Sequence, residues 1–245
     1  MNSGIYTAYS GMQAQADALD IVANNLANIN TTGFKAEKAF FTLLQQYSGE
    51  GIEPDTLNAA INKPVAVRGT FDLESGSMTR TYRDLDVAIE GNGFLVVDTP
   101  RGIRYTRNGN LDMNTQGILV TSDGYPVLGT ENKPITLGPG KVRIGVDGDI
   151  QLDGETVDSL KLVRFENLSS IEKEGASLFL SRSGRDIELK SDAKFKAEYL
   201  EESNVNPVQA MVRMISILRN FEAMQKSMSL ITNDINKQAI EKLSR

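Results

Sequence analysis

The last stretch of the chain, from Asn206 to about Ala239, carries the pattern that most constrains the fold. Apolar residues recur there at alternating spacings of four and three: Ala210, Met214, Ile217, Phe221, Met224, Met228, Ile231 and Ile235. Such a heptad stripe is typical of a long helix that buries one seam against another helix. Asn206 can cap the first free amides, and Pro207 suits the first helical position. The sequence therefore predicts a terminal helix that needs a partner along its length.

The first segment of the chain carries a similar stripe, which Ser3 can cap. The same alternating spacing runs through Ile5, Tyr9, Met12, Ala16, Leu19, Ala23 and Leu26. The run ends at residues 28–33, where Asn and Gly suit a helix exit. Both stripes lie at the extreme termini, and no segment near them in sequence is rich enough in apolar residues to cover them. We therefore expect the two helices to pack on each other as an antiparallel coil.

The middle of the chain consists of short β-type runs separated by turns. The runs are Val65–Val67, Asp86–Ile89, Gly93–Val97, Ile118–Val120, Pro126–Leu128, Val142–Ile144, Leu160–Phe165 and Leu178–Leu180, with further alternation at Ile187, Leu189, Phe195 and Tyr199. Asn-Gly or Asp-Gly pairs begin at residues 92, 108, 123, 147 and 153, and such pairs between apolar runs are the strongest local hairpin signal. Their recurrence predicts an all-β sandwich or barrel. Residues 33–50 fit either a further short helix or an extended arm.

These patterns together predict an α+β fold, in which an all-β domain is inserted between two terminal helices that form an antiparallel coiled coil. We expect residues 1–35 and 204–245 to form a discontinuous helical assembly domain. Residues 36–63 would be a linker or arm, and residues 64–203 the β domain. The terminal helix also carries apolar residues outside its seam, which indicates that it meets neighbouring molecules.

The composition excludes several classes of function. Of 245 residues, 40% are hydrophobic and 24% charged, as in ordinary globular proteins. The net charge of −6 and the absence of a basic patch argue against nucleic-acid binding. The chain contains no Cys, His or Trp, which excludes metal sites and catalytic triads built on thiolate or imidazole. No apolar run is long enough to span a membrane, and the N-terminus lacks the pattern of a cleaved signal peptide.

An enzyme is one alternative, because Asp147, Asp149, Asp153 and Glu155 could form a metal or paired-carboxylate site. Their spacing does not fit an EF-hand loop. Asp before Gly far more often forms a turn, and Gly91-Asn92-Gly93 lacks the helix that a phosphate-binding loop requires. We therefore expect no catalytic residue, no metal site and no cofactor.

Three groups of motifs resemble the flagellar rod and hook axial family. Residues 23–28 (Ala-Asn-Asn-Leu-Ala-Asn) and 32–35 (Thr-Gly-Phe-Lys) are similar to its N-terminal signature. Residues 200–221 are similar to its C-terminal motif, and residues 85–129 to the β domain of the basal-body rod proteins. Nearly the whole chain is covered. Within the family, the chain most resembles the proximal rod branch.

The resemblance implies a structural subunit of the flagellar basal-body rod, the drive shaft that transmits torque for motility. It implies self-assembly and assembly with other proximal and distal rod proteins. It also implies export through the flagellar type III apparatus without signal cleavage, a location in the periplasm, and terminal segments that fold into a coil on assembly. Membrane insertion is not expected.

We expect the assembly interface to lie on the two stripes and on the Asn cluster that follows the first one. Its predicted residues are Ile5, Tyr9, Met12, Leu19, Asn24, Asn25, Leu26, Asn28, Met214, Ile217, Phe221, Met224, Met228, Ile231 and Ile235. The Asn cluster, which also includes Asn30, has two interpretations. Asn either ends the helix or forms amide hydrogen bonds between subunits that fix their register.

Other readings stay open at this stage. The chain fits a distal rod protein or a hook-related paralogue, and the host could have one membrane or two. A monomeric, non-flagellar secreted binding module, with the coil as a stalk, is the alternative outside the family.

Overall fold

The computed structural model describes residues 2–43, 65–165, 171–181 and 188–243. The chain divides into two compact units. The helical unit comprises Met1–Leu26, Glu37–Thr70 and Pro207–Arg245, and the β unit comprises Ala27–Ala36 and Phe71–Asn206. Each unit is described by itself below.

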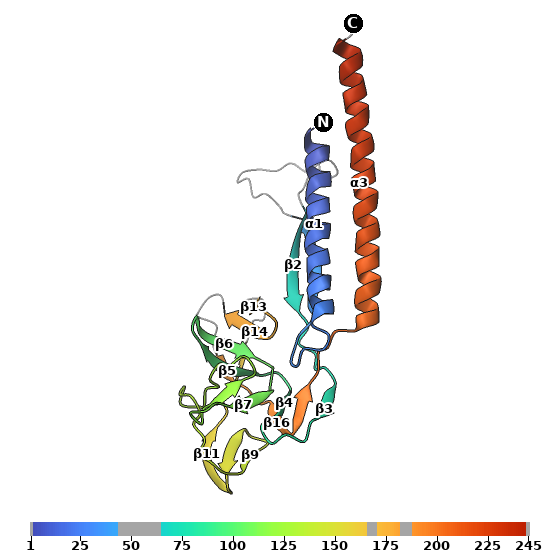
Figure 1. Cartoon of the computed structure of the whole chain (residues 1–245). Coiled ribbons are helices and arrows are strands. Elements are labelled where there is room, and N and C mark those ends of the chain that lie inside the picture. Colours follow the sequence, from blue (N-terminus) through green and yellow to red (C-terminus); the bar gives the residue numbers. More distant parts are fainter. Residues whose placement is uncertain (1, 44–64, 166–170, 182–187, 244–245) are drawn as a thin grey trace. The chain divides into compact units, whose positions relative to one another are not determined.

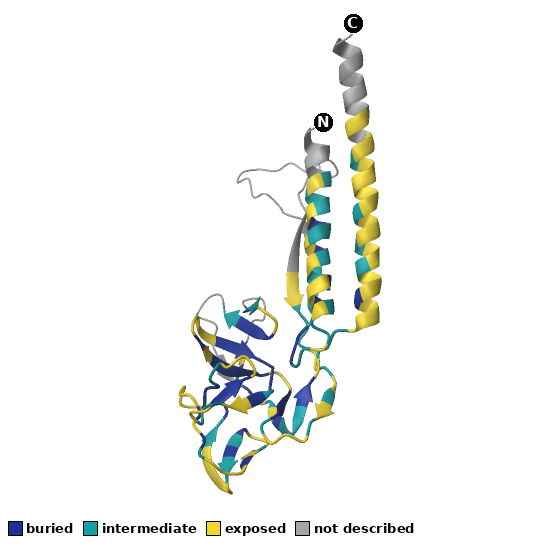
Figure 2. Ribbon diagram, in the orientation of Figure 1, coloured by how far each residue is buried: buried dark blue, intermediate teal, exposed yellow. Residues whose placement is uncertain are grey.

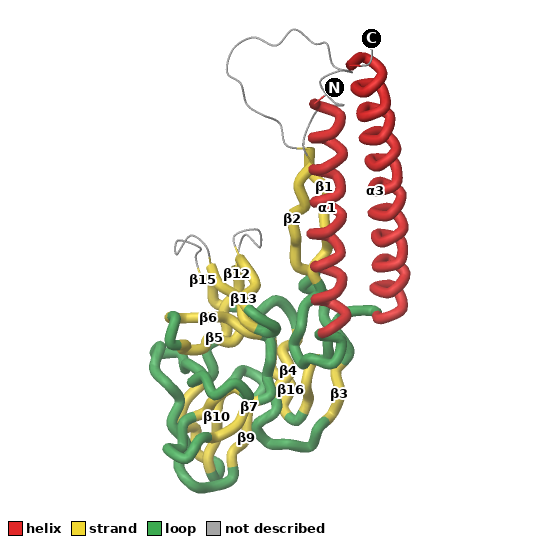
Figure 3. Tube along the Cα trace, turned by 45° about the horizontal axis from the view of Figure 1, so that its top comes forward, coloured by secondary structure: helices red, strands yellow, loops and turns green. Residues whose placement is uncertain are grey.

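The helical unit is built on two long helices that run antiparallel, side by side (Figures 1 and 3). Helix α1 spans Asn2–Ala27 and helix α3 spans Pro207–Leu243. A methyl group placed on Gly11 of α1 would lie 3.8 Å from the Sδ atom of Met224 on α3, so the helices are in contact there. The predicted antiparallel pairing of the terminal helices is therefore confirmed, as is Pro207 as the first residue of α3.

Two strands complete the helical unit. Strands β1 (Glu37–Leu43) and β2 (Val65–Phe71) form a two-stranded sheet next to α1. Of the two readings of residues 33–50, the extended one is correct for residues 37–43. Residues 44–64, which include most of the predicted arm, lie outside the described residues.

The β unit contains fifteen short strands within the described residues. They are β3 (Met78–Arg80), β4 (Val87–Glu90), β5 (Phe94–Thr99), β6 (Gly102–Thr106), β7 (Leu111–Met113), β8 (Leu119–Thr121), β9 (Val142–Ile144), β10 (Asp149–Leu152), β11 (Glu155–Ser159), β12 (Leu162–Phe165), β13 (Ile171–Glu174), β14 (Leu178–Ser181), β15 (Glu188–Lys190), β16 (Lys194–Ala197) and β17 (Tyr199–Glu201). The predicted β-rich insert is confirmed.

The strands of the β unit form antiparallel sheets. The largest has six strands in the order β13-β14-β6-β5-β12-β15, and a second has the order β11-β10-β9. Pairs β16-β4, β17-β3 and β7-β8 form two-stranded sheets. The predicted run Pro126–Leu128 forms isolated bridges, including Val127 to Val97, rather than a named strand. The predicted strand residue Ile187 lies outside the described residues.

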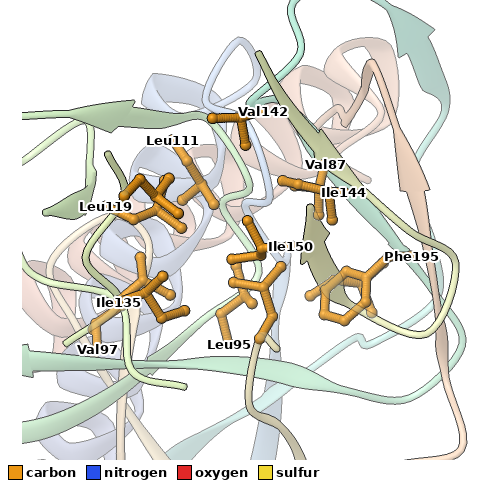
Figure 4. Close-up of a cluster of buried hydrophobic side chains, with 14 of the residues drawn as sticks. Val87, Leu95, Val97, Leu111, Leu119, Ile135, Val142, Ile144, Ile150 and Phe195 are labelled. Carbon is orange, nitrogen blue, oxygen red and sulfur yellow. The ribbon is translucent and has the colours of Figure 1, made fainter. Parts of the chain in front are cut away.

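The core of the β unit lies on both faces of β5, because successive side chains of a strand point to opposite faces. Leu95 and Val97 join one apolar cluster with Val87, Leu111, Leu119, Ile135, Val142, Ile144, Ile150 and Phe195 (Figure 4). Phe94 and Val96 join a second cluster, in which Phe94 contacts Phe165 and Phe179 edge to face. Burial on both faces explains why β5 reads as an uninterrupted apolar run.

The predicted turn pairs have more than one physical role. Gly124, Gly148 and Gly154 adopt positive φ, as the hairpin interpretation requires. Gly109 is different: a methyl group there would lie 1.7 Å from the carbonyl oxygen of Val87. Glycine at 109 thus allows two backbones to approach, and the turn interpretation of Asn108-Gly109 is wrong.

The close approach at Gly109 makes a specific prediction for stability. We expect Gly109→Ala to lower the free energy of unfolding by about 3 kcal/mol or more, because neither backbone segment can move aside. The matched control is Gly124→Ala, where φ is +84° and no atom lies within 4 Å of the added methyl group. That change should cost only about 1–2 kcal/mol. Urea unfolding followed by circular dichroism checks both, and equal losses would contradict the steric explanation.

Candidate assembly site

In the described part of α3, the residues that are not exposed are all predicted seam residues. Ala210 is buried, and Met214, Ile217, Phe221 and Met228 are half-buried. Met224 is 37% exposed and lies next to Gly11 of α1. The stripe on α3 therefore faces inward, toward α1. The side chains of Ile231 and Ile235 lie outside the described part of the helix.

On α1 the prediction selected the wrong face as the most buried one. Among the described side chains of α1, the buried ones are Ala14, Ala18, Val22 and Asn25. Figure 2 shows buried positions along this helix in dark blue. In the predicted stripe, Tyr9 is 58% exposed, Ala23 is exposed, and Met12, Ala16, Leu19 and Leu26 are only half-buried. The physical reason is that α1 packs against a helix and a two-stranded sheet, and small alanine side chains allow that close packing. The side chain of Ile5 lies outside the described residues.

A second apolar face of α3 is uncovered, and we call it the outer face. At about 100° of rotation per residue, its centre lies roughly 135° around the helix from the centre of the seam. Its residues are 40–69% exposed and comprise Val208, Met211, Val212, Ile215 and Leu218. Exposed apolar residues that cluster on one side of a helix mark an interaction surface, whereas scattered ones do not.

The predicted Asn cluster serves several purposes. The Asn25 side chain is buried; its Nδ2 donates to the carbonyl oxygen of Glu37 at 2.7 Å, and its Oδ1 accepts from the Glu37 amide at 2.9 Å. Asn28 forms the turn after α1, accepting from the amide and the hydroxyl of Thr31. Neither interpretation of the cluster describes Asn25, which attaches β1 to α1 within one chain. Asn24 is exposed, and its role between subunits stays a prediction.

Three charged residues of the β unit meet in its interior, and we call them the ionic cluster: Lys35, Arg107 and Glu201. All three side chains are 0% exposed. Lys35 Nζ lies 2.6 Å from Glu201 Oε1, and Arg107 Nε lies 3.0 Å from Glu201 Oε2. The remaining guanidinium donors of Arg107 reach the carbonyl oxygens of Ile89, Gly91 and Gly93. One carboxylate thus serves two buried cations.

The segment around Lys35 is fitted closely into the β unit. Gly33 adopts φ +67°, and a methyl group there would lie 2.5 Å from the backbone of Arg107, so only glycine fits. Phe34 is fully buried, with Lys173 Nζ 3.2 Å from its ring centroid. Thr32 donates to Asn108 Oδ1 at 2.8 Å. The motif at residues 32–35 therefore forms part of the β unit's packing.

The same region joins three stretches of backbone. The Gly33 amide donates to the Glu201 carbonyl oxygen, and the Asp72 amide to that of Ala36. Asn204 Oδ1 accepts from the Ala36 amide at 2.7 Å, while its Nδ2 donates to the carbonyl oxygens of Asp72 and Glu74. Residues 33–36, 72–76 and 201–204 are held together by these bonds. Sequence reasoning missed Lys35, Arg107, Glu201 and Asn204 as a group, since no local pattern connects them.

Burial lowers the pKa of Lys35, and the positive charge of Arg107 lowers it further, while Glu201 opposes both effects. A charged amine without a partner in this interior would be strongly disfavoured. The two bonds of its Nζ, to Glu201 and to the Glu74 carbonyl oxygen, compensate for the lost hydration.

Two of the four acidic residues that suggested an enzyme, Asp147 and Asp153, have structural roles. Asp147 pairs with Lys194, and Asp153 Oδ1 accepts from the Lys141 amide at 2.9 Å. Within the described ranges, no group of three or more acidic residues is arranged to hold a metal ion. In the same ranges, no helix is both long and apolar enough to cross a membrane.

The double hydrogen bond of Asn25 generates a stability prediction. Asn25→Ala removes both bonds to Glu37 and should lower the free energy of unfolding by about 1–3 kcal/mol, the usual cost of leaving polar groups unsatisfied. Asn30→Ala is the control at an exposed Asn of the same cluster, with an expected change within about 0.5 kcal/mol. Urea unfolding of the purified chain measures both. If the two variants unfolded alike, Asn25 would not be the residue that attaches β1.

Three family models match the chain in succession. The model of the flagella basal body rod protein matches residues 5–35. The model of the flagellar hook protein FlgE/F/G D1 domain matches residues 88–155, and that of the flagellar basal body rod FlgEFG protein C-terminal region matches residues 196–234. Each matched range contributes one member of the ionic cluster: Lys35, Arg107 and Glu201 in turn.

Full-length relatives agree with the family models. The FlgF basal-body rod protein of Caulobacter vibrioides is 35% identical over 247 residues, covering 100% of this chain and 99% of the relative. The FlgG basal-body rod proteins of Buchnera aphidicola (subsp. Schizaphis graminum) and Bacillus subtilis are 33% and 32% identical, each covering 100% of both chains. This similarity sets aside the non-flagellar binding module. The chain therefore belongs to the flagellar basal-body rod proteins, a family of structural subunits of the flagellum rather than of enzymes.

Proposed function

We propose that the chain joins the rod through the outer face of α3 and through exposed residues of α1, with copies of itself and other axial rod proteins as partners. Membership of the rod family implies assembly with other axial proteins. The observation that carries the proposal is the uncovered apolar face formed by Val208, Met211, Val212, Ile215 and Leu218. A subunit that functioned alone would expose this surface to water at a cost.

The energetics favour neighbours at this face. Each large apolar side chain contributes roughly 1.5–3 kcal/mol when it is fully buried. The outer face supplies five such side chains, and Tyr9 on α1 adds an exposed aromatic ring. Head-to-tail contacts that do not close into a ring generate helical arrays, which is the geometry that a rod requires. Among the predicted interface residues, the proposal assigns Met214, Ile217 and Phe221 to the contact between the helices and Tyr9 to neighbours. The five outer-face residues were not among the predicted ones.

Within the family, we propose a place in the rod like that of the FlgF proteins, the proximal rod branch. The FlgF relative of Caulobacter vibrioides aligns over 247 positions, close to the 245 residues of this chain. The FlgG relative of Buchnera aphidicola needs 269 positions for the same chain, so at least 24 (269 minus 245) lack a counterpart here. Export through the flagellar type III apparatus, without signal cleavage, is part of this proposal.

Ile215 provides the most direct test, since it is 52% exposed at the centre of the outer face. We expect Ile215→Asp to leave the unfolding midpoint unchanged but to abolish incorporation into basal bodies and swimming, because a charge would be buried at the contact. Ser227→Asp adds the same charge at an exposed position of α3 that belongs neither to the seam nor to the outer face, about two and a half turns beyond Leu218. It should assemble normally. Basal bodies purified from each strain give the readout, and normal incorporation of Ile215→Asp would refute the outer-face contact.

The seam makes a different prediction. Phe221 is half-buried on the α1 side of α3. Phe221→Asp should separate the helices and block incorporation, and it should also lower the helical content of the purified chain. The strands of the β unit should remain folded. Far-ultraviolet circular dichroism and basal-body analysis test this together, and a motile strain with normal rods would contradict it.

A further inference from the structure

We propose that Lys35 is a positioning residue that, with Glu201 and Arg107, locks together the chain segments through which the helical unit is connected to the β unit. The lock makes these segments move together within the β unit when the chain is loaded. This inference rests on the proposed function, because it concerns a subunit that transmits torque. It assigns to the ionic cluster a purpose beyond the stability of the fold.

The positions of the chain crossings support the proposal. The chain passes between the two units after residues 26, 36, 70 and 206. Lys35 adjoins the second crossing. Its Nζ donates to the carbonyl oxygen of Glu74, shortly after the third crossing, and to Glu201, shortly before the fourth. One ammonium group therefore ties together segments from three crossings, within the β unit.

Further hydrogen bonds near Lys35 join the same three segments, at residues 33–36, 72–76 and 201–204. Asn204 bonds to both other segments, through the Ala36 amide and the carbonyl oxygens of Asp72 and Glu74. The Gly76 amide donates to Glu201 Oε1 at 3.1 Å. Without such bonds, each segment could rotate about its own backbone dihedrals. With them, a displacement of one segment displaces the others.

The charge balance separates Lys35 from its two partners. Two cations share one carboxylate, so removal of Glu201 would leave both cations buried without a counter-charge, which is strongly destabilising. Removal of the Lys35 charge instead leaves a neutral Arg107–Glu201 pair, still supported by the Gly76 amide. Loss of one partner destabilises a buried ion pair strongly when it leaves a charge uncompensated, and loss of the Lys35 charge leaves none. The Lys35 ammonium is therefore explained better by the geometry it fixes than by the stability it adds.

Arg107 connects the ionic cluster to the six-stranded sheet, which contains β6, and to the two-stranded sheet that contains β4. It follows β6, and its guanidinium group bonds to the backbone at the end of β4 and in the turn before β5. A force on residue 35 or residue 201 thus reaches the centre of the β unit through short, charge-assisted bonds, which are stronger than neutral ones.

The test uses Lys35→Met in the full-length chain, with Lys133→Met as the matched control. Lys133 is an exposed residue whose side chain is 76% accessible. We expect Lys35→Met to keep the unfolding midpoint close to wild type, whereas Glu201→Gln lowers it clearly. We also expect at least tenfold faster hydrogen exchange at the amides of Ala36 and Asp72, which report on the lock. Exchange at the Leu128 amide, which bonds to Val96 within the β core, should not change.

The same variants test the mechanical role in cells. Lys35→Met should enter rods and support swimming in dilute medium, but motility should fall several-fold more steeply than wild type as medium viscosity rises. Lys133→Met should behave as wild type. Unchanged exchange at Ala36 and Asp72, a loss of stability as large as that of Glu201→Gln, or wild-type motility at high viscosity would overturn the inference. If wild-type protein were absent from purified rods, the proposed function would fail instead, and the exchange comparison would still decide whether Lys35 forms the lock.

Discussion

Among the described residues, the buried carboxylate of Glu201 is the one anion that pairs with both buried cations of the ionic cluster in the β unit. The Glu201 carboxylate accepts hydrogen bonds from Lys35, Arg107 and the Gly76 amide. The side chains of Glu201, Lys35 and Arg107 are all inaccessible to solvent. Charges in a protein interior are tolerated only when their hydrogen-bonding groups are satisfied. The surrounding structure meets that demand by bringing carbonyl oxygens from residues 74, 89, 91 and 93 to the two cations. The positions of several loops are thus dictated by polar requirements rather than by apolar packing.

Apolar packing organises the rest of the β unit around β5, which is buried on both faces and connects the two clusters of the core. The helical unit follows a different principle. A long helix pair buries a narrow seam, and small residues on α1 let the helix approach its neighbours closely. Apolar side chains on α3 are then left without a cover in the single chain. The two units therefore differ: the β unit has two buried apolar clusters, whereas the helical unit leaves an apolar face of α3 exposed.

The sequence was informative where local periodicity carries the information. Heptad spacing predicted both helices, their antiparallel pairing and the inward face of α3, and turn pairs with alternating apolar residues predicted the β-rich insert. It failed on the face of α1, because periodicity was judged from large side chains while the buried contacts belong to Ala14 and Ala18. It assigned Gly109 to a turn, because a close approach to Val87 depends on a distant strand. The ionic cluster was out of reach for the same reason: its members lie 94 and 166 positions apart.

The separation of Lys35 from Glu201 also sets an order of events in folding. Contacts that join distant positions form late, because a large loop must close before they can contribute. A chain that emerges with its N-terminus first has placed both cations, Lys35 and Arg107, long before the carboxylate at position 201 arrives. Until then, the two cations lack the carboxylate that compensates their charges in the folded β unit. The final strand before α3, β17, therefore supplies the counter-charge on which the burial of both cations depends.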